Sequence, residues 1–420
     1  GRGGEGERGS RGAGEQGGRG VRITHYALRI THYVLRFTFY VLLPMLIAFL
    51  LASPWMLLRP TACWRGAWIQ AGMVAGRYDF PYTRQYAGTW PYVYPLAQMA
   101  LWGLGPLATL AGTMGLARAL RRWRTASFAV RVAALWTLVY FLATAGLYVK
   151  FPRYLLPIYP VWAAWASYEL GVRSGERAGQ RISESTSQRI SEKASRRIGE
   201  PASQRISESA NGEKYPTPYS LLPTPYSLLT LISTALLGLA QVSVYTAPHP
   251  WVTASRWVYE NVPPGAIVAV EMWDHPLPAP LPEGDAAQYQ QITLPIFDDE
   301  SLEKTGRLGE AIQKADVIIL ASRRGYGALA RLPGRYAQTL TWYRELLGTR
   351  NVIAFGRCPR LGPLALSDDP LADAGLPPQL SLAERCGTPF ALRLPRLDES
   401  FRVYDTPTVL IIKKWEMGNE

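Results

Sequence analysis

The first residues that could do chemistry lie in the stretch KFPRYLLPIYP, residues 150–160, where Lys150 and Arg153 stand among prolines and aliphatic residues. The two cations lie on either side of Pro152, so both side chains can face one side of a bent segment. An arginine binds phosphate through a two-pronged fork, whereas a lysine acts as a point charge. The spacing therefore indicates a phosphate site, and the alternative is that the two cations anchor the end of a membrane helix.

A second group of candidates lies in RYDFPYTRQYAGTWPYVYP, residues 77–95. It contains Asp79, Arg84 and Gln85 among several tyrosines and Trp90. An aromatic belt with snorkelling arginines would explain the aromatic residues. It explains Asp79 and Gln85 less well, so this loop is also a candidate for contacts with a ligand.

A third group, EMWDH at residues 271–275, follows a predicted strand, and α/β sheets bind ligands at the ends of their strands. Glu271, Asp274 and His275 could bind a divalent ion or a substrate, and the flat ring of Trp273 could stack on a sugar. One histidine beside two acids also fits an ordinary loop with surface carboxylates. The sequence leaves both interpretations open.

The apolar residues, 48% of the chain, concentrate before residue 250 in blocks long enough to cross a bilayer. Trp and Tyr stand at the ends of these blocks, as in the aromatic belts of membrane proteins. We expect an α-helical integral membrane region of about five spans, followed by a C-terminal extracytoplasmic α/β domain, and a buried core helix is the alternative for the shorter blocks. The predicted spans are Phe37–Leu58, Val93–Ala117, Phe128–Val149, Tyr154–Leu170 and Leu228–Ala247.

The formal net charge of +13 is unevenly distributed along the chain, and basic loops tend to stay in the cytoplasm. Segments 1–36, 118–131 and 171–226 carry +4, +5 and +3, whereas 227–420 carries −3. With the basic segments inside, the spans alternate and the C-terminal part lies outside, although loop 59–92, predicted outside, carries +3. We predict an integral membrane protein, with membrane lipids rather than nucleic acid beside the basic loops.

Short repeats occur in two regions of low complexity. RITHYAL, RITHYVL and RFTFYVL follow one another from Arg22, a period-eight SQRISEKA-like run spans 187–210, and PTPYSLL occurs twice in 216–229. These units are too short and too polar to build a stacked-repeat core, so we interpret them as sequence drift; a membrane-surface helix is the alternative for the first. The predicted organisation is a disordered repeat tail (1–36), four spans (37–170), a low-complexity cytoplasmic loop (171–226), a fifth span (227–247) and the external α/β domain (248–420).

The last segment alternates predicted helices with predicted strands, which is typical of a layered α/β sheet. The expected helices are 251–262, 301–315 and 335–348, and the expected strands are 266–271, 316–322 and 351–357. We expect loops or lids in the Pro-rich stretches 275–297 and 359–400, and a closing hairpin over 401–414.

The three cysteines, Cys63, Cys358 and Cys386, show no CxxC spacing and are too few for a disulfide scaffold. On the predicted outer side, a Cys358–Cys386 disulfide is permitted. Two free or buried thiols are an equally open alternative.

Four stretches together resemble bacterial multi-spanning glycosyltransferases of the GT-C type: PYTRQYAGTWPYVYPLAQMALWGLGP, KFPRYLLPIYP, ASRWVYENVPPGAIVAVEMWDHPLP and ESFRVYDTPTVLIIKK. This group, often described as family 39 or phospholipid carrier-dependent, is related to the protein O-mannosyltransferases and the lipid A aminoarabinose transferases. The resemblance covers about residues 45–170 and 230–420. It implies an inverting transferase in the inner (plasma) membrane of a prokaryote, which moves a sugar from a polyprenyl-phosphate carrier to an acceptor at the outer membrane face.

The resemblance also implies roles for the candidate residues. Such enzymes use an acidic residue in the first external loop as a base or a metal-linked acid, and Asp79 is the candidate here, with a divalent cation as an open cofactor. Cations stabilise the departing phosphate. The predicted lipid-linked sugar phosphate site comprises Arg84, Gln85, Tyr86, Lys150, Arg153 and Tyr154, and the predicted acceptor site comprises Glu271, Trp273, Asp274 and His275.

Members of this family have more spans than the chain, which starts at Gly1 and has no Met before Met45. We therefore expect the C-terminal portion of a longer protein, in a form that lacks the N-terminal catalytic half. The alternative function is a non-catalytic membrane protein whose external α/β domain binds a glycan or a protein partner. A transporter is disfavoured because most predicted spans carry no charged residue.

Overall fold

The computed structural model describes His32, Arg36 and residues 38–171, 225–349, 351–376 and 380–413. The chain divides into two compact units, Gly1–Gly72 and Met73–Glu420. The predicted tail 1–36 and the predicted low-complexity loop 171–226 lie almost wholly outside the described residues.

In the first unit, prolines interrupt the apolar sequence. A π-helical turn, η1 (Thr38–Leu42), leads into α2 (Leu43–Ala52), and α3 (Trp55–Leu58) and α4 (Pro60–Val74) follow. Helix α2 ends at Ser53, one residue before Pro54, because a proline disfavours helical backbone in the residue that precedes it. The apolar helix of this unit is therefore Phe39–Ala52, which is shorter than the predicted span Phe37–Leu58.

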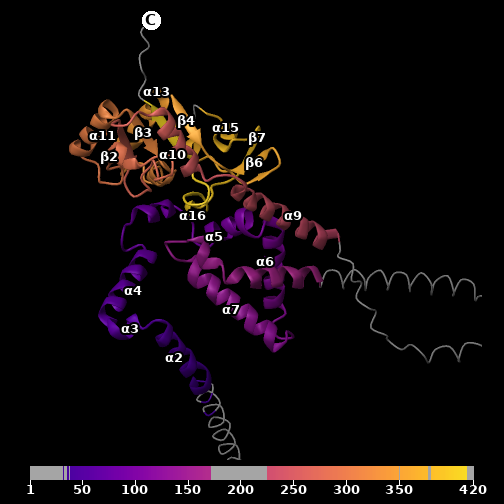
Figure 1. Ribbon diagram of the computed structural model, residues 1–420. Coiled ribbons are helices and arrows are strands. Elements are labelled where there is room, and N and C mark those ends of the chain that lie inside the picture. Colours follow the sequence, from indigo (N-terminus) through magenta and orange to yellow (C-terminus); the bar gives the residue numbers. More distant parts are fainter. Residues whose placement is uncertain are drawn as a thin grey trace, which may run out of the picture. The chain divides into compact units, whose positions relative to one another are not determined.

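The second unit begins with a helical part (Figure 1). A glycine at φ 89°, Gly105, divides the predicted span Val93–Ala117 in two, and Pro106 starts the new helix. The elements in chain order are η2 (Pro81–Tyr86), α5 (Val93–Gln98), the π-helical η3 (Met99–Gly103), α6 (Pro106–Arg121), α7 (Phe128–Ala145), η4 (Pro152–Leu155), a helix at 158–171, α9 (Pro225–Val242) and η7 (Ser243–Thr246).

Helix α6 and the helix at 158–171 pack closely because two glycines lie between them. A Cβ atom at Gly112 would overlap the side chain of Trp162, and one at Gly115 would overlap the carbonyl oxygen of Trp165. At the end of α6, Arg118 Nε lies 2.7 Å from Glu169 Oε2 of the second helix. The carboxylate and the guanidinium thus neutralise each other between the two helices.

Two of the described helices are long and apolar enough to cross a membrane, by length and composition alone. One is α7, and the other lies within Pro225–Asn261, which begins with α9; only 17% and 11% of their apolar windows are buried. They correspond to the predicted spans Phe128–Val149 and Leu228–Ala247. The prediction of about five spans is therefore not supported by the described residues, because proline and glycine breaks shorten the first two spans and the helix at 158–171 is too short.

The α/β part is built on a five-stranded sheet with the order β2-β1-β3-β8-β4. Strand β1 pairs in parallel with β2 and β3, whereas β8 runs antiparallel to both β3 and β4. From β1 the chain passes to β2 on one side of β1, and from β2 it passes to β3 on the other side of β1. The direction in which strands are added to the sheet therefore reverses between β1 and β3. The strands are β1 (Ile267–Glu271), β2 (Gln290–Leu294), β3 (Val317–Leu320), β4 (Val352–Phe355) and β8 (Val409–Lys413).

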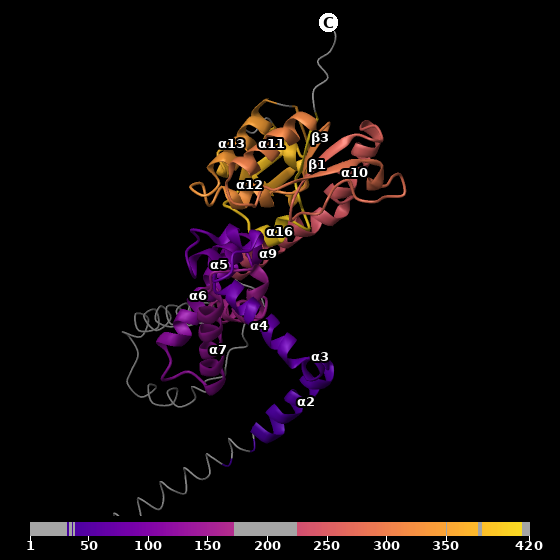
Figure 2. The ribbon, with the colours of Figure 1, turned by 90° about the vertical axis from the view of Figure 1, so that its left-hand side faces the viewer.

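Helices cover both faces of this sheet (Figure 2). Along β3, Val317 and Ile319 pack toward α10 (Pro250–Asn261), while Ile318 and Leu320 pack toward α11 (Leu302–Lys314) and α13 (Ala337–Thr349). Strands that are buried on both faces read as continuous apolar runs. The three helices and three strands predicted within 251–357 are thereby confirmed, with ends shifted by a few residues.

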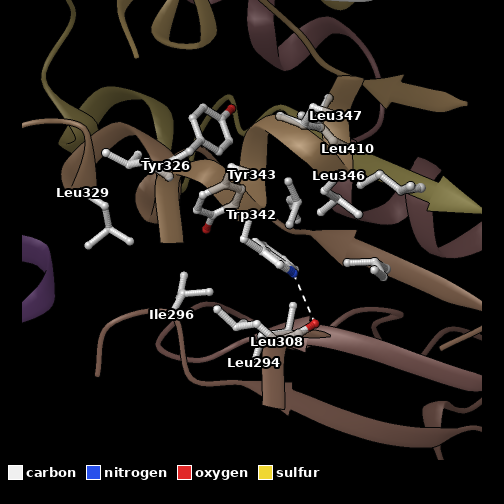
Figure 3. Packing of buried hydrophobic residues seen from close by; sticks show 14 of the residues in the cluster. Leu294, Ile296, Leu308, Tyr326, Leu329, Trp342, Tyr343, Leu346, Leu347 and Leu410 are labelled. Carbon is white, nitrogen blue, oxygen red and sulfur yellow. Dashed lines mark hydrogen bonds between the residues drawn. The ribbon is translucent and has the colours of Figure 1, made fainter. Parts of the chain in front are cut away.

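The larger core cluster lies between the sheet, α11 and α13 (Figure 3). Trp342 Nε1 donates a hydrogen bond to the carbonyl oxygen of Leu308, at 3.2 Å, which joins α13 to α11. Tyr343 packs edge-to-face on Tyr326 of the short helix α12 (Arg324–Leu329), with ring centroids 6.0 Å apart. These contacts hold α12 in place directly after β3.

The segment 359–400 contains more regular structure than predicted. It forms a second sheet of β5 (Arg360–Leu361), β6 (Leu364–Ser367) and β7 (Phe390–Arg393), with the short helices α14 (Pro370–Asp373), α15 (Leu382–Cys386) and α16 (Glu399–Arg402). Cys358 and Cys386 form a disulfide beside it. The predicted hairpin over 401–414 is wrong, because α16 ends there and β8 inserts between β3 and β4. The Pro-rich stretch 275–297 likewise contains β2.

Candidate functional site

Asp79, the predicted catalytic residue, forms ion pairs with two arginines. Its two carboxylate oxygens each lie 2.9 Å from a nitrogen of Arg84, and Arg335 Nη1 donates to Oδ2 at 2.7 Å. The hydrogen bond from Arg84 is the main cause that lowers the pKa of Asp79, and the bond from Arg335 adds to it. A general base works best when its pKa lies near the operating pH. Asp79 is therefore engaged in a structural bridge and is poorly suited to accept a proton.

Arg84 is fully committed within the protein. Besides Asp79, its Nη1 donates to the carbonyl oxygen of Phe297 at 3.0 Å. Its guanidinium also lies over the rings of Phe297 and Tyr336, 5.7 and 5.4 Å from their centroids. The residue is only 6% exposed. Arg84 therefore joins η2 to the α/β part and leaves no open fork for a phosphate.

Gln85 and its neighbours form a buried junction with α16. Gln85 Oε1 accepts a hydrogen bond from the backbone N–H of Glu399 at 3.0 Å. The hydroxyl of Tyr94 donates to Asp398 Oδ2 at 2.8 Å. Gln85 thus fixes the position of α16 rather than facing a ligand.

Lys150 is a buried cation without a carboxylate partner among the described residues. Its Nζ donates to Thr89 Oγ1 at 3.2 Å and to the carbonyl oxygen of Tyr148 at 3.0 Å, and the ring centroid of Tyr86 lies 5.9 Å away. Burial lowers the pKa of Lys150. A buried charge is costly unless it is paired, so a negatively charged ligand would stabilise this ammonium group.

Arg153 is exposed, and its guanidinium lies over aromatic rings instead of pairing with an acid of the described residues. The ring centroid of Phe151 is 4.1 Å away and that of Tyr154 is 5.8 Å away. The rings of Phe151 and Tyr86 are themselves in edge-to-face contact, with centroids 5.6 Å apart. The structure therefore places four of the six residues predicted for the phosphate site, Lys150, Arg153, Tyr86 and Tyr154, around one aromatic cluster.

The predicted acceptor residues lie where the strand order of the large sheet reverses. Residues 272–275 follow β1, and residues 321–324 follow β3, its parallel neighbour. In open α/β sheets, ligands bind outside the carboxyl ends of the strands at this reversal point. Glu271, Trp273, Asp274 and His275 therefore lie at the kind of position where such sheets bind ligands.

Glu271, the last residue of β1, is buried and holds a proton near neutral pH. Burial raises its pKa to about 8, although a hydrogen bond from the Tyr343 hydroxyl to Oε1 opposes the shift. Its Oε2 has no hydrogen-bond partner among the described residues. A neutral carboxyl of this kind can donate a hydrogen bond to a ligand.

Asp274 is tied to the loop after β3. Its Oδ2 accepts a hydrogen bond from Ser322 Oγ, and its Oδ1 accepts one from the backbone N–H of His275 at 3.1 Å. Arg324 Nη1 lies 3.9 Å from Oδ1. Burial raises the pKa of Asp274, and the bond from Ser322 and the charge of Arg324 oppose this shift. The two loops are thereby locked together across the reversal point.

The rings of His275 and Trp273, the two aromatic residues of the predicted acceptor site, have different surroundings. His275 stacks on Trp251, with ring centroids 5.1 Å apart and an interplanar angle of 18°. Trp273 is 51% exposed and has a φ of 71°, a backbone conformation that is rare for a bulky residue. Trp273 therefore offers a free ring to solvent, whereas one face of the His275 ring is covered.

Sequence reasoning missed the residues that follow β3 and those of α16. Arg323 pairs with Asp368, and Arg402 lies 3.6 Å from the same carboxylate, beside a cavity of about 20 Å³, which holds roughly one water molecule. Glu399 is buried, and both of its carboxyl oxygens lack a hydrogen-bond partner among the described residues. Burial raises the pKa of Glu399 to about 7. Only the position of RR directly after a predicted strand could have drawn attention to this region.

No group of three or more His, Cys, Asp or Glu side chains in the described part of the chain is arranged to hold a metal ion. Glu271, Asp274 and His275 therefore do not converge as metal ligands. Comparison of the chain with protein-family models, with curated proteins and with solved structures gave no match. The function of the site must therefore be inferred from the contacts of its own residues.

Proposed function

We propose that this protein binds a lipid-linked sugar phosphate at the outer face of a prokaryotic inner membrane and transfers the sugar to an acceptor. Lys150 and Arg153 would bind the phosphate, and the loops after β1 and β3 would receive the acceptor. The likeness of the sequence to GT-C type glycosyltransferases supports the choice of donor. The single observation that carries the proposal is Lys150, a buried ammonium group whose described partners are all uncharged.

Two further features fit this ligand. Arg153 is exposed beside the same aromatic cluster and keeps its guanidinium fork available. The pair lies in the short segment that joins α7, one of the two helices able to cross a membrane, to the helix at 158–171. A phosphate headgroup carried by a membrane lipid would lie at this depth. Paired cations would also stabilise the charge that develops on the leaving phosphate during transfer.

The proposal can be tested with the full chain reconstituted into vesicles that contain a radiolabelled polyprenyl-phosphate sugar, with a panel of hydroxyl-bearing acceptors (oligosaccharides and glycolipids) supplied. We expect sugar transfer in the wild type and a loss of at least about tenfold in Lys150→Met and Arg153→Gln, since each removes one charge-assisted contact. The matched control is Arg121→Gln, which removes an exposed cation from the end of α6. Full transfer by both variants would contradict the proposal.

The pairing of Asp79 favours a second candidate function, which is binding without catalysis. Both oxygens of this carboxylate are held by arginines, and no other acidic residue of 77–95 is present to replace it as a base. In that case the same vesicles would show binding of the lipid phosphate that depends on Lys150, with no transfer by the wild type. The two candidates are therefore separated by one assay.

A further inference from the structure

The reversal point between β1 and β3 carries two exposed aromatic side chains that the lipid phosphate site does not use. Trp273 is 51% exposed and Tyr404, which follows α16, is 61% exposed. They lie more than 100 residues apart in the sequence, yet a single guanidinium group contacts both residues. Their proximity is thus a product of the fold.

Arg324 makes this connection. Its Nη1 donates to the carbonyl oxygen of Trp273 at 2.8 Å, and its Nη2 donates to the hydroxyl of Tyr404 at 3.2 Å. The guanidinium carbon also lies 5.5 Å from the centroid of the Tyr404 ring. Arg324 is 9% exposed, and its Nε has no hydrogen-bond partner among the described residues. Arg324 therefore ties the loop that carries Trp273 to the segment that carries Tyr404, and its unpaired Nε is itself buried.

The backbone of Trp273 is held in an unfavourable conformation at this point. Its φ of 71° is unfavourable for a residue other than glycine. The bond from Arg324 and the pairing of Asp274 with Ser322 fix the loop on both sides of the indole. A glycine would make the same turn without strain, so the turn alone does not explain why a tryptophan stands here.

The polar neighbours decide which kind of ligand fits. Arg324 already has an acidic partner in Asp274, whose Oδ1 lies 3.9 Å from Arg324 Nη1, so a neutral ligand suits this guanidinium better than a phosphate does. Each exposed ring stands beside charged or polar residues, such as His275 and Asp405, instead of forming one broad apolar patch. Flat aromatic rings with a few placed donors and acceptors suit a ligand that has one apolar face and many hydroxyl groups.

We propose that Trp273, Arg324 and Tyr404 form a binding platform for a neutral carbohydrate, with the sugar ring on the indole and its hydroxyl groups on Arg324. This inference deepens the proposed function, because it names a carbohydrate as the acceptor at this site. The contacts of the platform involve neither Lys150 nor Arg153.

The test uses the full chain in detergent micelles and isothermal titration calorimetry with a panel of neutral oligosaccharides built from glucose, mannose, xylose or N-acetylglucosamine. We expect the wild type to bind at least one of them. Trp273→Gly should weaken that binding by about tenfold or more, because the stacking surface is lost. Trp273→Phe should restore part of the affinity.

Two controls separate a binding role from a structural one. The melting temperature of Trp273→Gly should equal or exceed that of the wild type, since glycine relieves the positive φ. Phe390→Ala, which removes an aromatic ring that is 63% exposed on β7, should leave oligosaccharide binding unchanged. Failure of every oligosaccharide to bind, or equal binding by the wild type and Trp273→Gly, would overturn the inference.

The outcome is independent of the lipid phosphate site. Trp273→Gly should bind the lipid phosphate as the wild type does, and Lys150→Met should bind the oligosaccharide as the wild type does. If Lys150→Met retains lipid binding while Trp273→Gly loses oligosaccharide binding, the result supports the carbohydrate platform and contradicts the proposed donor site.

Discussion

Asp79 illustrates how neighbouring charges change the chemistry of a residue. In sequence it is an acid in a loop rich in tyrosine, whereas in the folded chain it accepts hydrogen bonds from Arg84 and Arg335. Arg335 lies beside α13, far from Asp79 in the sequence, so this second bond belongs to the tertiary structure. The carboxylate stabilises the fold in its charged form and is a weak base for the same reason.

Replacement of Asp79 by asparagine should therefore destabilise the protein only when the carboxylate is charged. The pKa of Asp79 is lowered on folding from 3.8, so its contribution is present above that pH and is lost as the pH falls through the folded-state pKa. Because the group is partly exposed, we expect a loss of about 1 kcal/mol at pH 7 for Asp79→Asn. Chemical denaturation at pH 7 and at pH 3 would measure it, and an equal loss at both pH values would contradict the assignment.

Glu271 should have the opposite pH dependence. Its pKa rises from 4.5 to about 8 on folding, so the unfolded chain releases the proton near pH 4.5 while the folded chain retains it. The stability of the wild type should then decrease as the pH rises from 4.5 to 8. Glu271→Gln keeps an acceptor for Tyr343 and removes this proton. We expect it to be more stable than the wild type at pH 8, by roughly 1–3 kcal/mol.

The control for Glu271 is the same pair of proteins at pH 3.5, below both pKa values of the glutamate, where both side chains are neutral in the folded and unfolded states and the stabilities should be similar. Thermal unfolding at several pH values provides the measurement. If the wild type and Glu271→Gln show parallel pH profiles, burial does not hold the proton on Glu271.

At the residue scale, the sequence identifies the groups of the candidate site better than their partners. Trp273 and Lys150 could be named because their types stand out in their local sequence. Arg324 and Tyr404 could not be linked to Trp273, because β3 and α16 bring them there from distant segments. The sequence likewise predicts Arg84 at the phosphate site, since it gives no sign of the true partner of Arg84, the carbonyl oxygen of Phe297, which lies far away in the sequence.

At the scale of elements, small residues decide how closely the helices approach. Gly115 of α6 faces the backbone of Trp165, and Gly112 faces the Trp162 side chain. Helix interfaces in membranes are enriched in such residues because they allow close backbone contact. This packing holds α6 beside the helix that follows η4, and thus fixes one end of the segment that carries Lys150 and Arg153.

Gly115→Ala should disrupt this helix pair. The added methyl group meets a carbonyl oxygen of the backbone rather than a flexible side chain, so the helices must separate. We expect a loss of about 1–3 kcal/mol. The matched control is Gly238→Ala in α9, where a Cβ atom meets nothing within 4 Å, and alanine there should be neutral or stabilising. Thermal unfolding in detergent would compare them, and equal melting temperatures for the two variants would be evidence against the close packing.

The elements themselves were predictable where the apolar pattern was regular. Helix α11 and strands β1 and β3 are predictable from the pattern of apolar residues in 266–322, because the apolar residues of each element form one continuous face toward the core. Two kinds of feature were not predictable. The long apolar blocks gave no indication that Gly105 would turn to a positive φ and divide a helix, and the last strand could not be distinguished from a hairpin because its partners, β3 and β4, come from earlier segments.

At the scale of the second unit, buried polar contacts join the helical part to the α/β part. Gln98 of α5 is 4% exposed; its Nε2 donates to the carbonyl oxygen of Arg396 at 2.7 Å, and its Oε1 accepts from the backbone N–H of Asp398 at 3.0 Å. Gln85 makes a similar bond to Glu399. Such satisfied networks give one defined arrangement because each unpaired group would be costly.

Gln98→Met should weaken this connection without a large change in volume. It leaves two buried backbone groups unpaired, at roughly 1–3 kcal/mol each. We expect a lower melting temperature in differential scanning calorimetry, and a broader or divided transition as the two parts lose cooperativity. Gln290→Met, at an exposed position on β2, is the control. A single wild-type-like transition in Gln98→Met would show that the junction does not couple the two parts.

The proposed binding of a membrane-lipid phosphate by Lys150 is tested most directly with two ligands that differ only in that phosphate. The affinity of the full chain in micelles would be measured for a polyprenyl phosphate and for the uncharged polyprenol of the same length, in the wild type and in Lys150→Met. We predict that the wild type prefers the phosphate by about tenfold or more and that Lys150→Met loses most of this preference. An equal preference in both proteins would contradict the account.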